Sequence, residues 1–158
     1  MRLFYWTAAC IFVLDQVTKY YVVHIMDLRL AGRIDLLPPY FNLRMAWNTG
    51  INFGLMSGDA ALTRWVLISV ALLISGVVLW WVHREPLTGW QRITAGLLLG
   101  GALGNVVDRL IYGAVADFIN MSCCGINNPY AFNVADIAVF AGAIGLVLVP
   151  GRKTPRDL

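Results

Sequence analysis

The chain has 158 residues, of which 59% are hydrophobic and only 13% are charged. A soluble domain is typically about half apolar and about a quarter charged, so this composition argues against a soluble protein and indicates a chain that lies mostly in lipid. The 12 Lys and Arg exceed the nine acids by three, a surplus too small and too scattered to indicate a nucleic-acid partner.

Four apolar segments are long enough to cross a bilayer as helices, which takes about 20 residues. In chain order they are Phe4 to Met26, Leu62 to Val82, Ile93 to Tyr112, and Phe132 to Val149. We interpret the first as a retained helix rather than a cleaved signal peptide, because its apolar run continues well past the Ala-Ala-Cys box that ends at Cys10. We therefore predict an all-α polytopic membrane protein with four transmembrane helices, forming a single domain over residues 1–158.

The segment between the first two predicted spans, roughly Leu28 to Ala61, is more than a simple loop. Phe41 to Met45 alternates as a short strand does, and Asn48-Thr49-Gly50 is typical of a turn. The segment also contains apolar residues suited to the membrane surface, namely Trp47, Phe53, Leu55 and Met56. We expect a small extracytoplasmic β element that rests on the bilayer interface.

The positions of Lys and Arg predict the orientation of the chain. With four spans both termini lie on one side, and that side carries Arg2, Arg84, Arg92, Arg152, Lys153 and Arg156. The other side carries Arg29, Arg33 and Arg44, with Arg64 and Arg109 near helix ends, and Gly113 to Ala131 contains no basic residue. Because basic residues favour the cytoplasmic side, we expect cytoplasmic termini and two larger non-helical segments facing outward.

Ionisable residues within spans are costly and are therefore candidates for function. Asp15 and Lys19 stand four residues apart on one helical face, so an ion pair between them is enough to explain most of the reason for two charged residues in this span. Asp108 and Arg109 lie at the outer end of the third span, where a structural or substrate-orienting role is favoured over chemistry. The glycines between Leu99 and Gly104 suit close helix packing.

Asp117 and Asp136 differ from these because neither has a basic residue within four positions. The outer loop joining their helices places both near the outer surface. Two carboxyl groups in a low-dielectric site without cations repel each other, so one retains its proton near neutral pH. The ionised group can then activate water while the protonated one donates to a peptide carbonyl, as in aspartic proteases.

Two other interpretations of these polar residues stay open. Asp117 and Asp136 each stand near a helix end and could cap it, with Asp136 gaining from the dipole at an N-terminus. Asn105 and Asn133 lie in apolar sequence, where an unsatisfied amide is costly. They could hold the two aspartates, or a substrate backbone, by hydrogen bonds.

Five motifs in this order resemble bacterial lipoprotein signal peptidase, also called signal peptidase II. They are Asp15-Gln16-Val17-Thr18-Lys19, Asn48-Thr49-Gly50-Ile51-Asn52-Phe53-Gly54, Gly104-Asn105-Val106-Val107-Asp108-Arg109, Val115-Ala116-Asp117-Phe118 and Phe132-Asn133-Val134-Ala135-Asp136. The resemblance covers essentially the whole chain. Ile51 and Asn52 depart from the small residues often found before this Phe in the family.

The resemblance implies that Asp117 and Asp136 are the catalytic pair. The residues that match those shaping the site and holding the substrate are Asp15, Lys19, Asn48, Gly50, Asn105, Asp108, Arg109 and Asn133. It further implies an aspartic endopeptidase of the bacterial inner membrane, with its active site near the outer face. Its substrates would be prolipoproteins cut on the amino side of a diacylglyceryl-modified cysteine. No metal or organic cofactor is implied, the outer segment would be a lid, and a monomer is expected although the sequence leaves the oligomeric state open.

Three rival functions predict different arrangements of these residues. A proton-coupled carrier would place Asp15, Asp117 and Asp136 at different depths along a path. A non-catalytic assembly subunit would use its polar residues to bind partner helices, so the two carboxyl groups would be dispensable. A lipid phosphotransferase would need a cluster of metal-binding aspartates on one helix, which this sequence lacks.

Overall fold

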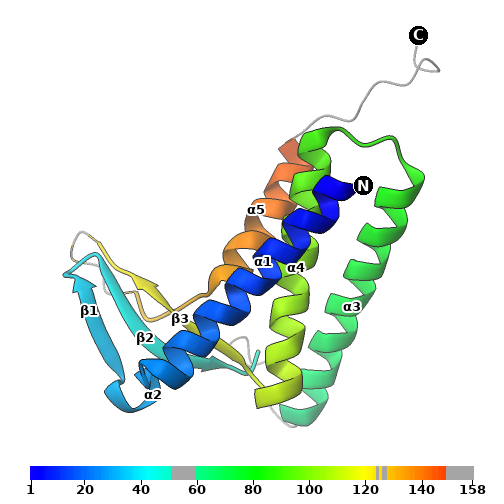
Figure 1. Cartoon of the computed structure of the whole chain (residues 1–158). Coiled ribbons are helices and arrows are strands. Elements are labelled where there is room, and N and C mark those ends of the chain that lie inside the picture. Colours follow the sequence, from blue (N-terminus) through cyan, green and yellow to red (C-terminus); the bar gives the residue numbers. More distant parts are fainter. Residues whose placement is uncertain (51–59, 124, 126–127, 149–158) are drawn as a thin grey trace.

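The computed structural model describes residues 1–50, 60–123, 125 and 128–148. Four long helices form a bundle, and a three-stranded sheet lies at one end of it (Figure 1). The long helices are α1 (Arg2–Tyr20), α3 (Ala60–Arg84), α4 (Gly89–Tyr112) and α5 (Val134–Leu148). A π-helical segment, Tyr21–Ile25, continues α1, and the one-turn helix α2 (Leu28–Ala31) follows it.

Each of the four predicted spans is a helix, with bounds a few residues from those expected. Of the described helices, α3 and α4 are long and apolar enough to cross a membrane by length and composition. The described part of α5 is a shorter apolar helix of 15 residues. Four helices are therefore confirmed, whereas four membrane crossings remain a prediction.

Helix α4 is central to the bundle and contacts α1, α3 and α5. It begins at a capping box, in which the Thr88 side chain accepts from the Gln91 backbone N–H and Gln91 bonds back to the Thr88 backbone. Its glycines let the neighbouring backbones approach. A Cβ on Gly100 would lie 2.5 Å from the carbonyl oxygen of Ala8 in α1, and one on Gly101 would lie 2.5 Å from that of Ala135 in α5. The expected small-residue packing is thus present.

The sheet is antiparallel, in the order β1 (Arg33–Leu37), β2 (Phe41–Asn48) and β3 (Val115–Met121). The predicted strand at Phe41 to Met45 is confirmed and continues to Asn48. Neither β1 nor β3 was predicted, and β3 lies in the segment that we expected to be an outer loop. Val22, Leu28, Leu43 and Phe118 form the small apolar core between the sheet and the end of the bundle.

The turn predicted after β2 is also present. Gly50 has a φ of +80°, which favours glycine, and its N–H donates to Oδ1 of Asn48 at 2.9 Å. A Cβ on Gly50 would also collide with Leu67 in α3. The apolar surface residues predicted to follow, Phe53, Leu55 and Met56, lie outside the described residues, as do Ile51 and Asn52.

The two ends of the bundle differ in what they carry. The start of α1, the connection from α3 to α4, and the end of α5 lie at one end, whereas the sheet lies at the other (Figure 1). This arrangement places β3 beside the last turn of α4 and the start of α5.

Candidate active site

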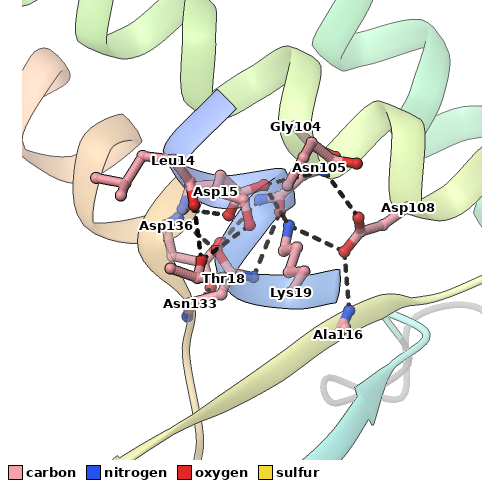
Figure 2. Close-up of polar contacts among 12 residues, drawn as sticks. Leu14, Asp15, Thr18, Lys19, Gly104, Asn105, Asp108, Ala116, Asn133 and Asp136 are labelled. Atoms are coloured by element: carbon pink, nitrogen blue, oxygen red, sulfur yellow. Dashed lines mark hydrogen bonds and ion pairs between the residues drawn. The ribbon is translucent and has the colours of Figure 1, made fainter. Parts of the chain in front are cut away.

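Polar residues of α1 and α4 and from the start of α5 meet at the sheet end of the bundle (Figure 2), and strands β2 and β3 add Asn48 and Asp117. The structure brings together nearly all of the predicted site residues: Asp15 and Lys19 from α1, Asn48 from β2, Asn105, Asp108 and Arg109 from α4, Asp117 from β3, and Asn133 and Asp136 at the start of α5. The tenth predicted site residue, Gly50, shapes the adjoining turn, and its backbone N–H donates to Oδ1 of Asn48.

Asp117 is 3% exposed and lies on β3 just beyond α4. Nδ2 of Asn133 donates to its Oδ1 at 2.6 Å, and the Asn48 side chain also bonds to it. Burial is the largest influence and raises the pKa of Asp117 to about 7, assisted by the charge of Asp136, while the two asparagines and Lys19 oppose that rise. This carboxyl group therefore holds a proton for part of the time at neutral pH.

Asp136 is the third residue of α5 and belongs to a second capping box. Oδ1 of Asn133, the N-cap residue, accepts from the Asp136 N–H at 2.8 Å, while Oδ2 of Asp136 accepts from the Asn133 N–H at 3.3 Å. The capping interpretation is thus correct for Asp136. It is incomplete, because Oδ1 of Asp136 also accepts from Nδ2 of Asn105 at 2.9 Å. Asp117, on a strand, caps no helix.

Asn133 connects the two carboxyl groups. It is fully buried, and it bonds to Asp117 through its side chain and to Asp136 through its backbone and side chain. Asn105 bonds to Asp136 from the opposite helix. The two asparagines therefore hold the aspartates, which is one of the two roles suggested by the sequence.

The expectation of a site without nearby cations is wrong. Arg109 is half-buried, and its charge interacts with Asp136, Asp117 and Asp108, in that order. Lys19 acts on Asp117 from α1. Arg109 stands eight positions before Asp117, and Lys19 is much farther away in sequence. Both cations approach the aspartates because α1 and α4 pack beside α5, and neither lies within four positions of them.

The predicted ion pair between Lys19 and Asp15 is confirmed, with Nζ at 2.8 Å from Oδ2. Lys19 also pairs with Asp108 at 2.9 Å. Sequence reasoning missed that second partner and missed Gln16, whose Nε2 donates to both acids at 3.2 Å. The signal for Gln16 was its place between Asp15 and Lys19, but a single glutamine carries little information by itself.

An open groove of about 700 Å³ runs along this cluster. Polar atoms of Asn48, Asp117 and Asp136 face it at one side, and Ile137, Phe140 and Ala141 of α5 form an apolar wall. Both Ile137 and Phe140 are exposed on the bundle surface. Among the described residues, no group of three or more His, Cys, Asp and Glu is arranged to hold a metal ion.

The chain as a whole is similar to known proteins in sequence and in fold. The family model for signal peptidase (SPase) II matches residues 7–150. The lipoprotein signal peptidase of Vibrio parahaemolyticus is 36% identical over 149 residues, covering 94% of this chain and 87% of the relative. That of Methylobacterium sp. (strain 4-46) is 39% identical over 142 residues, covering 90% and 84%. A bacterial membrane enzyme solved by the in meso method at 1.9 Å resolution superposes with a TM-score of 0.77 at 26% identity, covering 90% of this chain and 88% of that one.

Proposed function

The chain belongs to the signal peptidase II family, and from that premise we propose that it cuts diacylglyceryl-modified prolipoproteins with Asp117 and Asp136 as its catalytic pair. Membership makes the protein a hydrolase, an aspartic peptidase that removes signal peptides from prolipoproteins. The observation that supports the pair is their joint attachment to Asn133 at the edge of an open groove.

The unequal surroundings of the two aspartates suit a division of roles. Asp117 retains a proton near neutral pH for the reasons given above. Asp136 accepts N–H groups of Asn105 and Asn133 and faces the groove beside Asp117. We therefore assign Asp117 as the general acid and Asp136 as the general base.

The proposed reaction proceeds in two steps. Asp136 takes a proton from a water molecule as the water oxygen bonds to the scissile carbonyl carbon, and Asp117 gives its proton to the carbonyl oxygen. The resulting diol then collapses: Asp136 passes its proton to the leaving nitrogen, the carbon–nitrogen bond breaks, and Asp117 recovers a proton from a hydroxyl group. Arg109 lies near both carboxyl groups and would stabilise negative charge in the site.

The groove suggests how a lipidated substrate enters. Its apolar wall of Ile137, Phe140 and Ala141 belongs to α5, whose exposed side would face lipid. We propose that the substrate approaches across this wall so that the bond on the amino side of the modified cysteine reaches the polar side. The gathering of Asp117 and Asp136 at one end argues against a carrier with acids spaced along a path.

The proposed topology has four crossings, cytoplasmic termini and the sheet at the outer face of the inner membrane. The sheet and the start of α5 lie at the end of the bundle opposite the start of α1 (Figure 1). Asp117 belongs to β3 and Asp136 to the first turn of α5, which suits this orientation. We propose that residues 1–158 act as one domain, as a monomer and without a cofactor.

The deciding experiment is cleavage of a diacylglyceryl-modified prolipoprotein by wild type, Asp117→Asn and Asp136→Asn, purified in detergent. We expect wild type alone to cut, and only the lipidated substrate, with each variant at least about 1,000-fold slower because general acid–base catalysis and water activation are lost. Asp35→Asn, at an exposed acid on β1, is the matched control and should keep full activity. Turnover by both active-site variants would refute the pair.

A further inference from the structure

Three buried ionisable residues lie behind the proposed catalytic pair and do not line the groove. Asp15 is 0% exposed, Asp108 is 1% exposed and Lys19 is 3% exposed. A buried ion pair is often no more stabilising than apolar residues of similar volume. We therefore look for a role of these three residues other than stabilising the fold.

Lys19 uses all three of its N–H donors in this cluster. Nζ contacts Oδ2 of Asp15 at 2.8 Å, Oδ2 of Asp108 at 2.9 Å and Oδ1 of Asn105 at 3.1 Å (Figure 2). A lysine ammonium donates and never accepts, so the Asn105 atom facing it is the oxygen. The amide nitrogen of Asn105 is then turned away from Lys19 and donates to Oδ1 of Asp136 at 2.9 Å.

Each of the two acids also binds the backbone next to a catalytic candidate. Oδ1 of Asp15 accepts from the N–H of Ala135 at 2.9 Å, and Oδ2 of Asp108 accepts from the N–H of Ala116 at 3.0 Å. The two alanines are both 0% exposed. They directly precede Asp136 and Asp117, in two segments that share the sequence Val-Ala-Asp.

These contacts reach two different kinds of secondary structure, a helix start and a strand. Ala135 lies in the first turn of α5, where N–H groups lack partners within the helix, and Asp15 supplies one from α1. Ala116 lies on β3, just after Gly113, whose φ of +80° ends α4. Asp108 reaches back from α4 across that turn.

We infer that Asp15 and Asp108 are positioning residues, each holding the backbone N–H that precedes one aspartate of the pair, and that Lys19 fixes the two holders relative to each other. The positioning role rests on the proposed function, whereas the contacts themselves do not depend on it. Asp15, Lys19 and Asp108 touch no reacting atom in this assignment.

Hydrogen–deuterium exchange of the two Val-Ala-Asp segments tests this inference directly. A carboxylate accepts from Lys19 and the backbone together, whereas an asparagine has a single acceptor oxygen and cannot serve both equally. Asp15→Asn should therefore accelerate exchange at 134–136 by about tenfold or more and leave 115–117 near the wild-type rate. Asp108→Asn should do the reverse. Equal acceleration of both segments, or of neither, would overturn the inference.

Gly104→Ala provides a second variant that keeps every charge. The added Cβ would lie 2.5 Å from Oδ2 of Asp15, so it displaces that carboxylate. We expect faster exchange at 134–136 but not at 115–117, as with Asp15→Asn. Unchanged exchange at 134–136 would count against the role of Asp15 even if Asp15→Asn fails to fold.

Kinetics separate positioning from a purely structural role. Displacement of a catalytic group by about 1 Å can lower the rate about 100-fold, so we expect Asp15→Asn and Asp108→Asn to lower kcat by about 10- to 100-fold with little change in KM for the lipidated substrate. A change in KM alone would overturn the positioning role. If Asp117→Asn were active while the exchange pattern held, the proposed pair would fail and the backbone contacts would stand.

Discussion

The interface between α1, α4 and α5 has two halves of opposite character. In the half away from the sheet, glycines bring the helix backbones into contact: a Cβ on Gly96 would lie 2.7 Å from the carbonyl oxygen of Phe4, and one on Gly142 would lie 2.7 Å from that of Thr94. Phe4, Ala95 and Leu99 are buried there. In the half near the sheet, the same helices meet through Asp15, Lys19, Asn105 and their partners.

The difference separates the packing that supports stability from the residues of the proposed chemistry. Lipid is as apolar as the helix surfaces, so helices in a membrane associate by close van der Waals packing and hydrogen bonds. The glycine-packed half supplies the first of these without any ionisable group among its described contacts. The polar half buries charges that add little net stability but hold Asp117 and Asp136 in place. Substitutions in the two halves should therefore have separable effects.

The largest expected effect on stability is that of Gly100→Ala. The added methyl group would meet the backbone of Ala8 at 2.5 Å, which cannot move without displacing α1, so we expect a loss of about 3 kcal/mol. Thermal unfolding in detergent measures it. Activity per folded molecule should change less than stability, because Gly100 faces Ala8 and Ile11 of α1 rather than a residue of the proposed site.

Gly76→Ala in α3 is the matched control for that substitution. A Cβ there would meet nothing within 4 Å, and alanine is the better helix former by about 1 kcal/mol. We expect Gly76→Ala to be neutral or slightly stabilising. Similar losses for both glycine variants would show that backbone contact is not what holds α1 against α4.

The next largest effect is a pH-dependent gain in stability for Asp117→Asn. The pKa of Asp117 is raised from 3.8 to about 7 in the folded protein. Well below pH 3.8 the Asp117 carboxyl group is protonated in both the folded and the unfolded chain, so it does not change the free energy of unfolding. As the pH rises toward 7, Asp117 ionises in the unfolded chain before it does in the folded protein. Ionisation therefore favours the unfolded state, and wild type loses stability relative to the variant.

The gap between the two melting curves should therefore open between pH 4 and pH 7. Asparagine carries no charge to bury, so we expect the variant to be more stable at pH 7 on the order of 2 kcal/mol. Asp35→Asn, whose acid is exposed beside Arg33, should follow wild type throughout. A constant gap across this range would mean that burial does not hold the proton on Asp117.

The sequence predicted what depends on local patterns and missed what depends on distant contacts. The apolar runs gave the four helices, and the spacing of Asp15 and Lys19 gave their ion pair. Strand β3 was missed because Val115 to Phe118 are buried in succession, so they lack the alternation of a half-exposed strand. The pairing of Lys19 with Asp108 spans 89 positions of the chain.

Backbone contacts were beyond the reach of the sequence for a different reason. The N–H groups of Ala116 and Ala135 belong to residues whose side chains carry no chemistry, so no pattern of residue types marks them. The motifs nevertheless named residues that the structure brings together around Asp117 and Asp136. What the structure adds is which atoms join them.

The smallest expected effect is that of Thr88→Ala, at the end of α4 farthest from the site. The change removes the oxygen that accepts the Gln91 N–H at 3.3 Å, and loss of such a cap lowers stability by about 1 kcal/mol. Thr88→Ser keeps the hydroxyl group and should restore most of it. Neither variant should alter kcat or KM. The stretch of α4 around Gly100 and Gly101 packs against the backbones of α1 and α5, so it should keep fraying at Thr88 from reaching the polar half. A fall in kcat for Thr88→Ala that Thr88→Ser repairs would mean that fraying at one end of α4 reaches Asn105 at the other, and the two halves would not be separable.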